Sequence, residues 1–362
     1  MNYKTNAQDL RTKALDWMGR KILREGVKSM RIKYEDMKNE FKRVLCTRGF
    51  SEEQAEISAE LFTENSCDGI YSHGVNRFPR VIEYLEKGYI KVGALPTLVE
   101  SKGAFERWDG NLGMGNVNAK LCMDRAIELA RKNGIGCVAL SNTNHWMRGG
   151  AYGWQAARAG CVGICWTNTQ PNMPAWGAKD RRIGNNPIIF AVPREKGHVV
   201  TDMAVAQFSY GKMEECKLKN QLLPVPGGFD TKGELSRDPA EIEKTWRVLP
   251  VGFWKGSGLS ILLDLIAAVL SGGNSTHEVG KLGDDELALS QIFIAFDAAN
   301  IAGSDFLSKV VNDVVTDVKN SDKADEKGSI FYPGEMEEKT RADNLANGIP
   351  VNDDIWQIIQ SM

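Results

Sequence analysis

The stretch NAKLCMDRAIELARKNGIGCVALSNT, residues 118–143, joins a helix pattern to a strand pattern and decides the fold class. Apolar residues recur at helical spacing up to Gly134, which predicts the end of a helix, and the run IGCVALSNT then predicts a buried strand. The same order returns in GGAYGWQAARAG, residues 149–160, followed by CVGICWTNT, residues 161–169. Alternating strands and helices are typical of α/β layers. Both strands end in polar residues, and open α/β sheets bind ligands at such strand ends.

Further elements are expected on both sides of these two units. Residues 34–49 have the spacing of an amphipathic helix that Gly49 ends, and Ser51 with Gln54 has the capping-box spacing that opens a second helix. The remaining expected elements are a third helix after residue 77, strands at 186–193, 198–204 and 290–299, and helices at 304–320 and in the last thirty residues.

Two stretches in the second half of the chain depart from this alternation. Residues 217–244 carry Pro and Gly in mixed polar sequence and are expected to form an excursion loop. Residues 256–273 are apolar nearly all round, so we expect that helix to be buried between layers.

The composition is that of an ordinary globular protein. A length of 362 residues suggests about two domains, and 42 % apolar residues suffice for a large core. A net charge of −2 argues against nucleic acid as a partner, and the absence of a long uninterrupted apolar run argues against a membrane span. Seven cysteines without C-x-x-C spacing indicate reduced thiols in a cytoplasmic protein. Residues 1–29 lack the apolar segment of a signal peptide and are expected to form a peripheral extension.

Standard catalytic and cofactor motifs are absent from the sequence. The glycine-rich runs at 110–115 and 252–258 lack the spacing of a Rossmann fingerprint, and there is no Walker A, G-x-S-x-G or H-E-x-x-H motif. The four histidines have no metal-ligand spacing, so no metal is expected.

The stretch YSHGVNR, residues 71–77, gathers one of these scarce histidines with polar neighbours. His73 is a candidate general acid, and Arg77 offers a fork that matches a carboxylate. In a helix the two side chains would share a face, and a proton donor beside an anion clamp suits a small keto or hydroxy acid. The alternative is a solvent-facing histidine at a helix cap.

Two further polar clusters follow predicted strands. In SNTNHWMRGG, residues 141–150, His145 and Arg148 precede two glycines whose N–H groups could approach a phosphate or carboxylate, unless the stretch is only a polar turn. Lys179, Arg181 and Arg182 could meet a cofactor phosphate, although isolated charge runs are more often a solvated surface.

Taken together, these clusters resemble the malate/L-lactate dehydrogenase family, whose cofactor fold is not a Rossmann fold and which includes L-sulfolactate and ureidoglycolate dehydrogenases. The resemblance extends from residue 30 to the C-terminus, and the run SHGVNR identifies the family. The turn that usually reads G-T-N-P in the family is GNNP here, residues 184–187. The other stretches that carry the resemblance are DGIYSHGVNRFPR, NHWMRGGAYGWQAARAG, GICWTNT, WGAKDRRIGNNP, FSYGK, VPGGFD, GFWKGSGLSILLD and FYPGE.

The resemblance implies a three-layer α/β/α fold with a mixed sheet, like that of L-sulfolactate dehydrogenase. It implies four parts: the extension 1–29, a helical part 30–115 with the SHGVNR segment, an α/β part 116–300 that binds cofactor and substrate, and C-terminal helices 301–362 that pack on the N-terminal part. It also implies a homodimer with the active site near the subunit interface.

The resemblance also implies an activity and a set of site residues. The subgroup most similar to this chain reduces 2,3-diketo-L-gulonate to 3-dehydro-L-gulonate with NADH, NADPH being possible. Malate, lactate, sulfolactate or ureidoglycolate remain alternative substrates, and a non-catalytic ligand-binding protein on the same fold is an alternative of another class. The family's proton donor falls on His73 with Arg77 beside it, whereas the ureidoglycolate branch places the acid at His145. Expected substrate contacts are Ser72, Arg77, Asn144 and Arg148; expected cofactor contacts are Thr169, His198, Val199, Val200, Thr201, Asp202, Met203, Ala204, Trp254, Lys255, Gly334, Glu335 and Met336.

Overall fold

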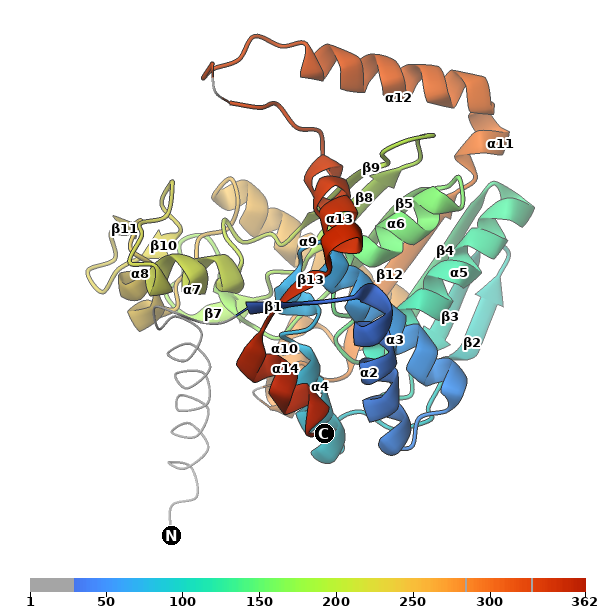
Figure 1. Ribbon diagram of the computed structural model, residues 1–362, viewed down its shortest axis with the longest axis horizontal. Helices are drawn as coiled ribbons and strands as arrows, with labels where there is room; N and C mark the ends of the chain where they lie inside the picture. Colours follow the sequence, from blue (N-terminus) through green and yellow to red (C-terminus); the bar gives the residue numbers. More distant parts are fainter. Residues whose placement is uncertain (1–28, 284, 327) are drawn as a thin grey trace.

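A seven-stranded mixed β-sheet forms the centre of the protein in the computed structural model, which describes residues 29–283, 285–326 and 328–362 (Figure 1). Six neighbouring pairs make up the sheet, and only β3 and β4 run parallel. In spatial order the strands are β2 (Thr97–Lys102), β3 (Phe105–Asp109), β4 (Ile135–Thr143), β12 (Leu289–Phe296), β5 (Val162–Thr167), β8 (Ile188–Val192) and β9 (Val199–Met203). The predicted extension, up to residue 28, lies outside the described residues.

The late strand β12 lies between β4 and β5 and is antiparallel to both. Its first residues therefore lie beside the last residues of the other two: Leu289 pairs with Thr143, and Gln291 with Thr167. The segment that precedes β12 therefore lies near the segments that follow β4 and β5, at the same end of the strands.

Alternating residues of the central strands face two helical layers, as period-two side-chain alternation requires. Val138 and Leu140 of β4 pack with α5 (Gly115–Asn133) and α6 (Gly150–Arg158). Their neighbour Ala139 faces the opposite side and packs with Leu263 and Ala267 of α9 (Trp254–Ser271). The helix stop predicted at Gly134 is confirmed, since this residue ends α5 with a left-handed φ of 83°. The expected three-layer α/β/α arrangement with a mixed sheet is confirmed.

The prediction that residues 256–273 are buried all round is wrong. Helix α9 packs on the sheet through one face, which includes Ser260, Leu263 and Ala267. The apolar side chains of its other face are 40 % to 74 % exposed: Ile261, Leu262, Leu265, Ile266 and Val269. With 18 residues and a mean hydropathy of 1.4, α9 is, among the described residues, the one helix with the length and composition of a membrane span. One third of that stretch is buried inside the protein, as expected for a helix that covers a sheet.

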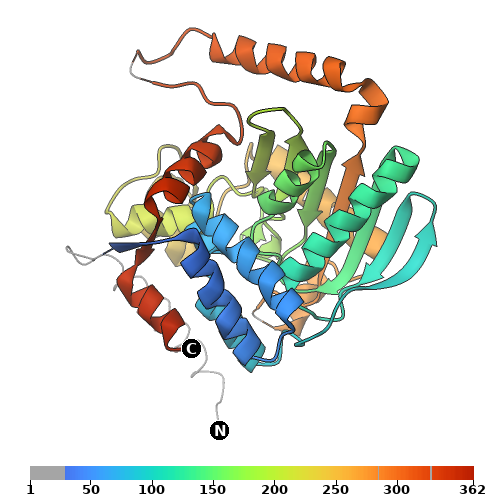
Figure 2. The same cartoon turned by 45° about the vertical axis from the view of Figure 1, so that its right-hand side comes forward.

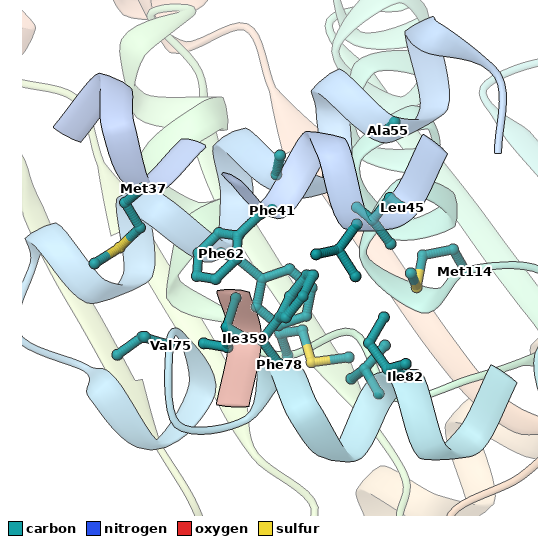
Figure 3. Packing of buried hydrophobic residues seen from close by; sticks show 14 of the residues in the cluster. Met37, Phe41, Leu45, Ala55, Phe62, Val75, Phe78, Ile82, Met114 and Ile359 are labelled. Carbon is teal, nitrogen blue, oxygen red and sulfur yellow. The ribbon is translucent and has the colours of Figure 1, made fainter. Parts of the chain in front are cut away.

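A second core lies beneath the N-terminal helices, α2 (Tyr34–Thr47), α3 (Glu52–Cys67) and α4 (Phe78–Glu86) (Figure 3). Ser51 caps α3 by accepting a hydrogen bond from the Gln54 N–H, as the capping-box spacing predicts. The C-terminal end contributes Ile349, Val351, Trp356 and Ile359 to this core. They come from β13 (Ile349–Asn352), which pairs with β1 (Ser29–Ile32), and from α14 (Asp353–Gln360).

The C-terminal part does not pack on the N-terminal helices over its whole length. Helix α13 (Glu335–Asn347) and α14 do so, whereas α11 (Ala298–Ala302) and α12 (Ser304–Lys319) form an arm that stands away from the body in both views (Figures 1 and 2).

The stretch predicted as an excursion loop forms a small lobe with its own core. Leu223, Ile242 and Val248 are buried there with Met213 and Cys216. Backbone hydrogen bonds from Val205 to Asn185 and from Val251 to Val205 tie the lobe to the sheet. Its elements are α7 (Tyr210–Leu218), β10 (Gly228–Phe229), β11 (Leu235–Ser236) and α8 (Pro239–Thr245); β6 (Met173–Pro174), β7 (Arg181–Ile183) and α10 (Thr276–Leu282) adjoin it.

Candidate active site

The SHGVNR segment forms a short 3-10 turn, Tyr71–His73, and leads into α4, whose N-cap is Arg77. Two hydrogen bonds fix it to the preceding helix: the Asn65 side chain donates to the His73 carbonyl (3.0 Å), and the Val75 N–H donates to Ser66 Oγ (2.8 Å). A Cβ on Gly74 would lie 2.2 Å from Ser66 Oγ, so only glycine fits here. The close approach explains why glycine follows the histidine.

His145 comes to the same place from the end of β4. Its ring is stacked on that of His73, with centroids 5.8 Å apart. The preceding residue, Asn144, is 3 % exposed, and its amide donates to the carbonyls of Tyr89, Leu112 and Gly113. The Asn144 side chain thus holds the loop that carries His145.

Burial and nearby cations favour the neutral form of both histidines. Burial, together with Arg77 and Arg148, lowers the pKa of His73 to about 4. Burial, Arg77, His73 and Arg80 lower the pKa of His145 well below its usual value. Both rings are therefore neutral near pH 7 unless an anion joins them.

The hydrogen-bond partners distinguish the two rings. Nδ1 of His145 accepts a hydrogen bond from the backbone N–H of Met147 (3.0 Å), so Nδ1 carries no proton. The proton of His145 is therefore on Nε2, which lies 3.4 Å from Glu286 Oε2. Nδ1 of His73 lies 3.0 Å from Ser72 Oγ, and a hydroxyl can either donate or accept. The Met147 N–H thus opposes a proton on Nδ1 of His145, whereas the Ser72 hydroxyl can accept as well as donate and permits a proton on Nδ1 of His73.

Beside the two histidines, Arg77 has unused hydrogen-bonding capacity. Its Nε is buried without a partner among the described residues, and its Nη2 lies 3.9 Å from Glu286 Oε2, beyond hydrogen-bond distance. Arg80, one helical turn on, is engaged by Tyr84 (2.8 Å) and Asp285 (3.2 Å). Arg77 is therefore positioned to receive a carboxylate.

Glu286 and Asp285 were missed by the sequence reasoning. They lie in the segment before β12, and the antiparallel pairing of β12 with β4 brings Glu286 to His145. An acidic run directly before a strand was visible in the sequence. The strand order that brings this acidic run to His145 was not visible.

Arg148, an expected substrate contact, lies in a buried ion-pair network. It is 4 % exposed, with Nη1 2.5 Å from Asp68 Oδ2 and Nε 3.7 Å from Asp202 Oδ2. Arg341 of α13 binds the other oxygen of Asp68 (2.6 Å). These contacts show Arg148 joining α3, α6, β9 and α13.

Two of the expected cofactor segments lie side by side. Val200 donates a backbone hydrogen bond to Pro333 (3.0 Å), and a Cβ on Gly334 would lie 3.0 Å from the His198 carbonyl, so residues 198–204 adjoin residues 334–336. Nδ1 of His198 accepts from the Arg194 N–H. Burial opposes ionisation of Glu335, but hydrogen bonds from Lys319 and Lys339 lower its pKa to about 2.

Thr169, another expected cofactor residue, contacts the GNNP turn. Thr169 donates its backbone N–H to Asn186 Oδ1 (3.0 Å), and its hydroxyl lies 3.3 Å from Asn185 Oδ1. The turn is therefore well supported with asparagine in place of the usual threonine. Trp254, at the start of α9, is 66 % exposed, and the Lys255 ammonium lies 5.9 Å from the centre of its ring.

The basic cluster is mainly a surface feature. Lys179 and Arg182 lie outside the core, and Arg182 pairs with Asp180 (2.6 Å). Arg181 lies close enough to Tyr210 to oppose the rise in its pKa that burial causes. The FSYGK stretch containing Tyr210 faces the SHGVNR segment, because a Cβ on Gly211 would lie 3.8 Å from Ser72 Cβ. In the described part of the chain, no group of three His, Cys, Asp or Glu side chains is placed to hold a metal ion.

Comparisons with known proteins identify relatives of this chain. The 2,3-diketo-L-gulonate reductase of Pasteurella multocida is 50 % identical over 333 residues, which cover 92 % of this chain and 100 % of that protein. The reductase of the same name from Escherichia coli K12 is 48 % identical over the same coverage.

Solved structures show the same fold. Malate dehydrogenase from Entamoeba histolytica superposes with a TM-score of 0.86 at 25 % identity, covering 92 % of this chain and 97 % of that one. Sulfolactate dehydrogenase from Methanocaldococcus jannaschii gives 0.82 at 30 % identity, with 91 % and 95 % covered. The family model described as malate/L-lactate dehydrogenase matches residues 32–360. The chain therefore belongs to the malate/L-lactate dehydrogenase family and is an oxidoreductase.

Proposed function

We propose that this protein reduces 2,3-diketo-L-gulonate to 3-dehydro-L-gulonate with NADH. Support comes from the named reductases that match it along 92 % of its length. The observation that carries the proposal is the meeting of His73, His145 and Arg77, with the buried Nε of Arg77 lacking a partner among the described residues. A proton donor and an anion clamp are what a keto acid reductase requires.

The proposed roles follow from these contacts. When bound, reduced nicotinamide supplies the hydride for the carbonyl carbon. Arg77 binds the substrate carboxylate and thereby fixes which carbonyl is presented. His73 gives its proton to the carbonyl oxygen as negative charge grows there. Arg77 neutralised by the substrate no longer depresses the pKa of His73 as strongly, so substrate binding itself favours the imidazolium.

His73 rather than His145 is the proposed donor. Protonation of His145 at Nδ1 would break the hydrogen bond from the Met147 N–H and bring two donors face to face. His73 has only the rotatable Ser72 hydroxyl at Nδ1. His145 then serves as a neutral ring that supports His73 by stacking.

The residues present fit a nicotinamide cofactor, which the family implies. Trp154 Nε1 is buried without a partner among the described residues, beside Gly334, and a donor there suits an oxygen-rich ligand. Residues 198–204 and 334–336, with Thr169, Trp254 and Lys255, are the proposed holders. NADH is the proposed form, as the resemblance to the diketogulonate subgroup implies.

A homodimer is also proposed. The exposed apolar face of α9 begins at Trp254, beside the proposed cofactor segment. The α12 arm presents a second face at four-residue spacing, 41 % to 62 % exposed: Phe306, Val310, Val314 and Val318. Contiguous apolar faces of this kind indicate protein contacts, and a second copy would bury them. Leu265→Asp should therefore give monomers in light scattering; an unchanged dimer would exclude α9 from the interface.

The seven thiols all lie in the described residues and are unpaired, which supports a cytoplasmic location for the protein.

The direct test of the function is a steady-state assay with purified protein, NADH and 2,3-diketo-L-gulonate. Turnover with this acid well above that with pyruvate supports the proposal. Turnover of malate, lactate or ureidoglycolate with NAD+, and none of 2,3-diketo-L-gulonate with NADH, would contradict it.

A further inference from the structure

Glu286 is the anionic side chain that faces the proposed substrate clamp. One oxygen, Oε2, lies 3.4 Å from His145 Nε2 and 3.9 Å from Arg77 Nη2. The side chain is 13 % exposed, so it is enclosed but still reachable by a ligand. No catalytic step proposed above uses it.

The charges around Glu286 leave room for one further anion. Arg80 is engaged by Asp285, which also accepts a hydrogen bond from the Tyr84 hydroxyl. Arg77 and Arg80 therefore face Asp285 and Glu286, two cations against two carboxylates. In the proposed complex, the imidazolium of His73 balances the one substrate carboxylate on Arg77, and a second anionic group would meet no free cation among these residues.

The same surroundings favour Glu286 as an acceptor. Burial raises the pKa of Glu286, and Asp285 adds to that rise, while Arg77 and Arg80 oppose it. The neutral His145 presents its Nε2–H to one oxygen of Glu286. Tyr210 of α7 completes the environment, because Glu286 contributes to the raised pKa of that phenol. A carboxylate with one oxygen near His145 and Arg77 has a second oxygen with which to accept substrate hydroxyl groups.

We propose that Glu286 is a specificity-determining residue: it accepts hydroxyl groups of a polyol tail and repels a second anionic group. The site would thus admit 2-keto acids with one carboxylate and a neutral hydroxylated tail, and disfavour dianions such as oxaloacetate and sulfopyruvate. Like charges placed together at a desolvated site are strongly unfavourable. The inference rests on the proposed function, since it assumes that Arg77 holds the substrate carboxylate.

The test compares Glu286→Gln with wild type. The quantity measured is kcat/KM for oxaloacetate divided by kcat/KM for 2,3-diketo-L-gulonate. Glutamine keeps the size and an acceptor oxygen but removes the charge, so this ratio should rise about tenfold or more, mainly through the KM of oxaloacetate. The KM of NADH should not change. Glu278→Gln, an exposed carboxylate on α10 paired with Lys281, is the matched control and should leave the ratio as in wild type.

A ratio for Glu286→Gln within about twofold of wild type would overturn the inference. If the variant turns over neither acid, calorimetry replaces kinetics. Malate should then bind at least tenfold more tightly, relative to L-gulonate, in the variant than in wild type, and an equal ratio again overturns the inference. Wild-type protein that reduces neither acid contradicts the proposed function instead, and the calorimetric ratio still decides the role of Glu286.

Discussion

Replacing Gly74 by alanine tests whether the close packing of the SHGVNR segment positions His73. The added Cβ would lie 2.2 Å from Ser66 Oγ, 2.8 Å from Ser66 N and 3.0 Å from the Phe62 carbonyl. The hydroxyl can rotate away, but the two backbone atoms belong to α3 and cannot. The segment must therefore move away from α3, which also stretches the Asn65–His73 and Val75–Ser66 hydrogen bonds.

The expected magnitudes follow from this geometry. Overpacking of this kind costs about 1–3 kcal/mol of unfolding free energy, and a shift of His73 by about 1 Å costs about 10²-fold in turnover. Chemical denaturation gives the first quantity and steady-state kinetics the second. Asn76→Ala, an exposed change in the same segment, should stay within about 0.5 kcal/mol and keep its turnover.

Adding Ser66→Ala to Gly74→Ala separates the two sources of the clash. Ser66→Ala removes the contact with Oγ and also the hydrogen bond that Oγ accepts from the Val75 N–H, so the double variant is compared with Ser66→Ala alone. We expect partial recovery, with Gly74→Ala costing less stability in that background. Gly74→Ala with wild-type stability and turnover would refute the reasoning, because the added Cβ would then fit against α3 without displacing the segment. Full recovery in the double variant would show that the hydroxyl alone causes the clash.

Three further predictions concern the cofactor segment and pH. Lys255→Ala should weaken NADH binding, measured by fluorescence titration. The unfolding midpoint should not fall, because among the described interactions the Lys255 side chain contacts only the exposed Trp254 ring. Unchanged NADH affinity would show that Lys255 is not part of the cofactor site. The pKa of His73 is about 4 in the folded protein and near 6.5 in the unfolded chain. Between pH 4 and 6.5 the unfolded chain therefore binds more protons than the folded protein. The free energy of unfolding should fall as pH drops from 6.5 towards 4. His73→Asn should show a shallower fall, and an equal slope would mean that this ring has the same pKa in the folded and unfolded chain. The rate of reduction should fall as pH rises through the pKa of His73 in the substrate complex, since the reaction uses the protonated ring.

Local patterns in the sequence predicted the elements well where propensity and burial agreed. The strand at 135–143 and the stop at Gly134 are both as expected, because a β-rich run after a helix-ending glycine has few alternatives. The stretch 217–244 was misjudged because its proline and glycine content masks short elements that only tertiary contacts with Leu223 and Val248 stabilise. The exposed face of α9 could not be read from hydropathy, because an interface and a core have the same composition.

The site shows the same division between local and long-range information. His73 and Arg77 could be paired from sequence because they are neighbours in one segment. The contacts of Glu286 with His145, and of Asp68 with Arg148, join positions 141 and 80 residues apart, and follow only from the strand order and helix packing. Arg148 illustrates the limit: its sequence context resembles an anion site, yet its guanidinium lies in a buried network with Asp68 and Asp202.

The central claim is that His73 donates the proton while His145 stays neutral, and one pair of variants tests it most directly. The kcat with NADH and 2,3-diketo-L-gulonate is compared between His73→Asn and His145→Asn. NADH binding is measured in parallel to show that both variants remain folded. Loss of a general acid typically costs 10²–10⁴-fold, about 3–5 kcal/mol of transition-state stabilisation. We expect that loss for His73→Asn with NADH binding retained, and a smaller loss for His145→Asn. Abolished turnover in His145→Asn, with most of it kept in His73→Asn, would contradict the account and assign the proton to His145.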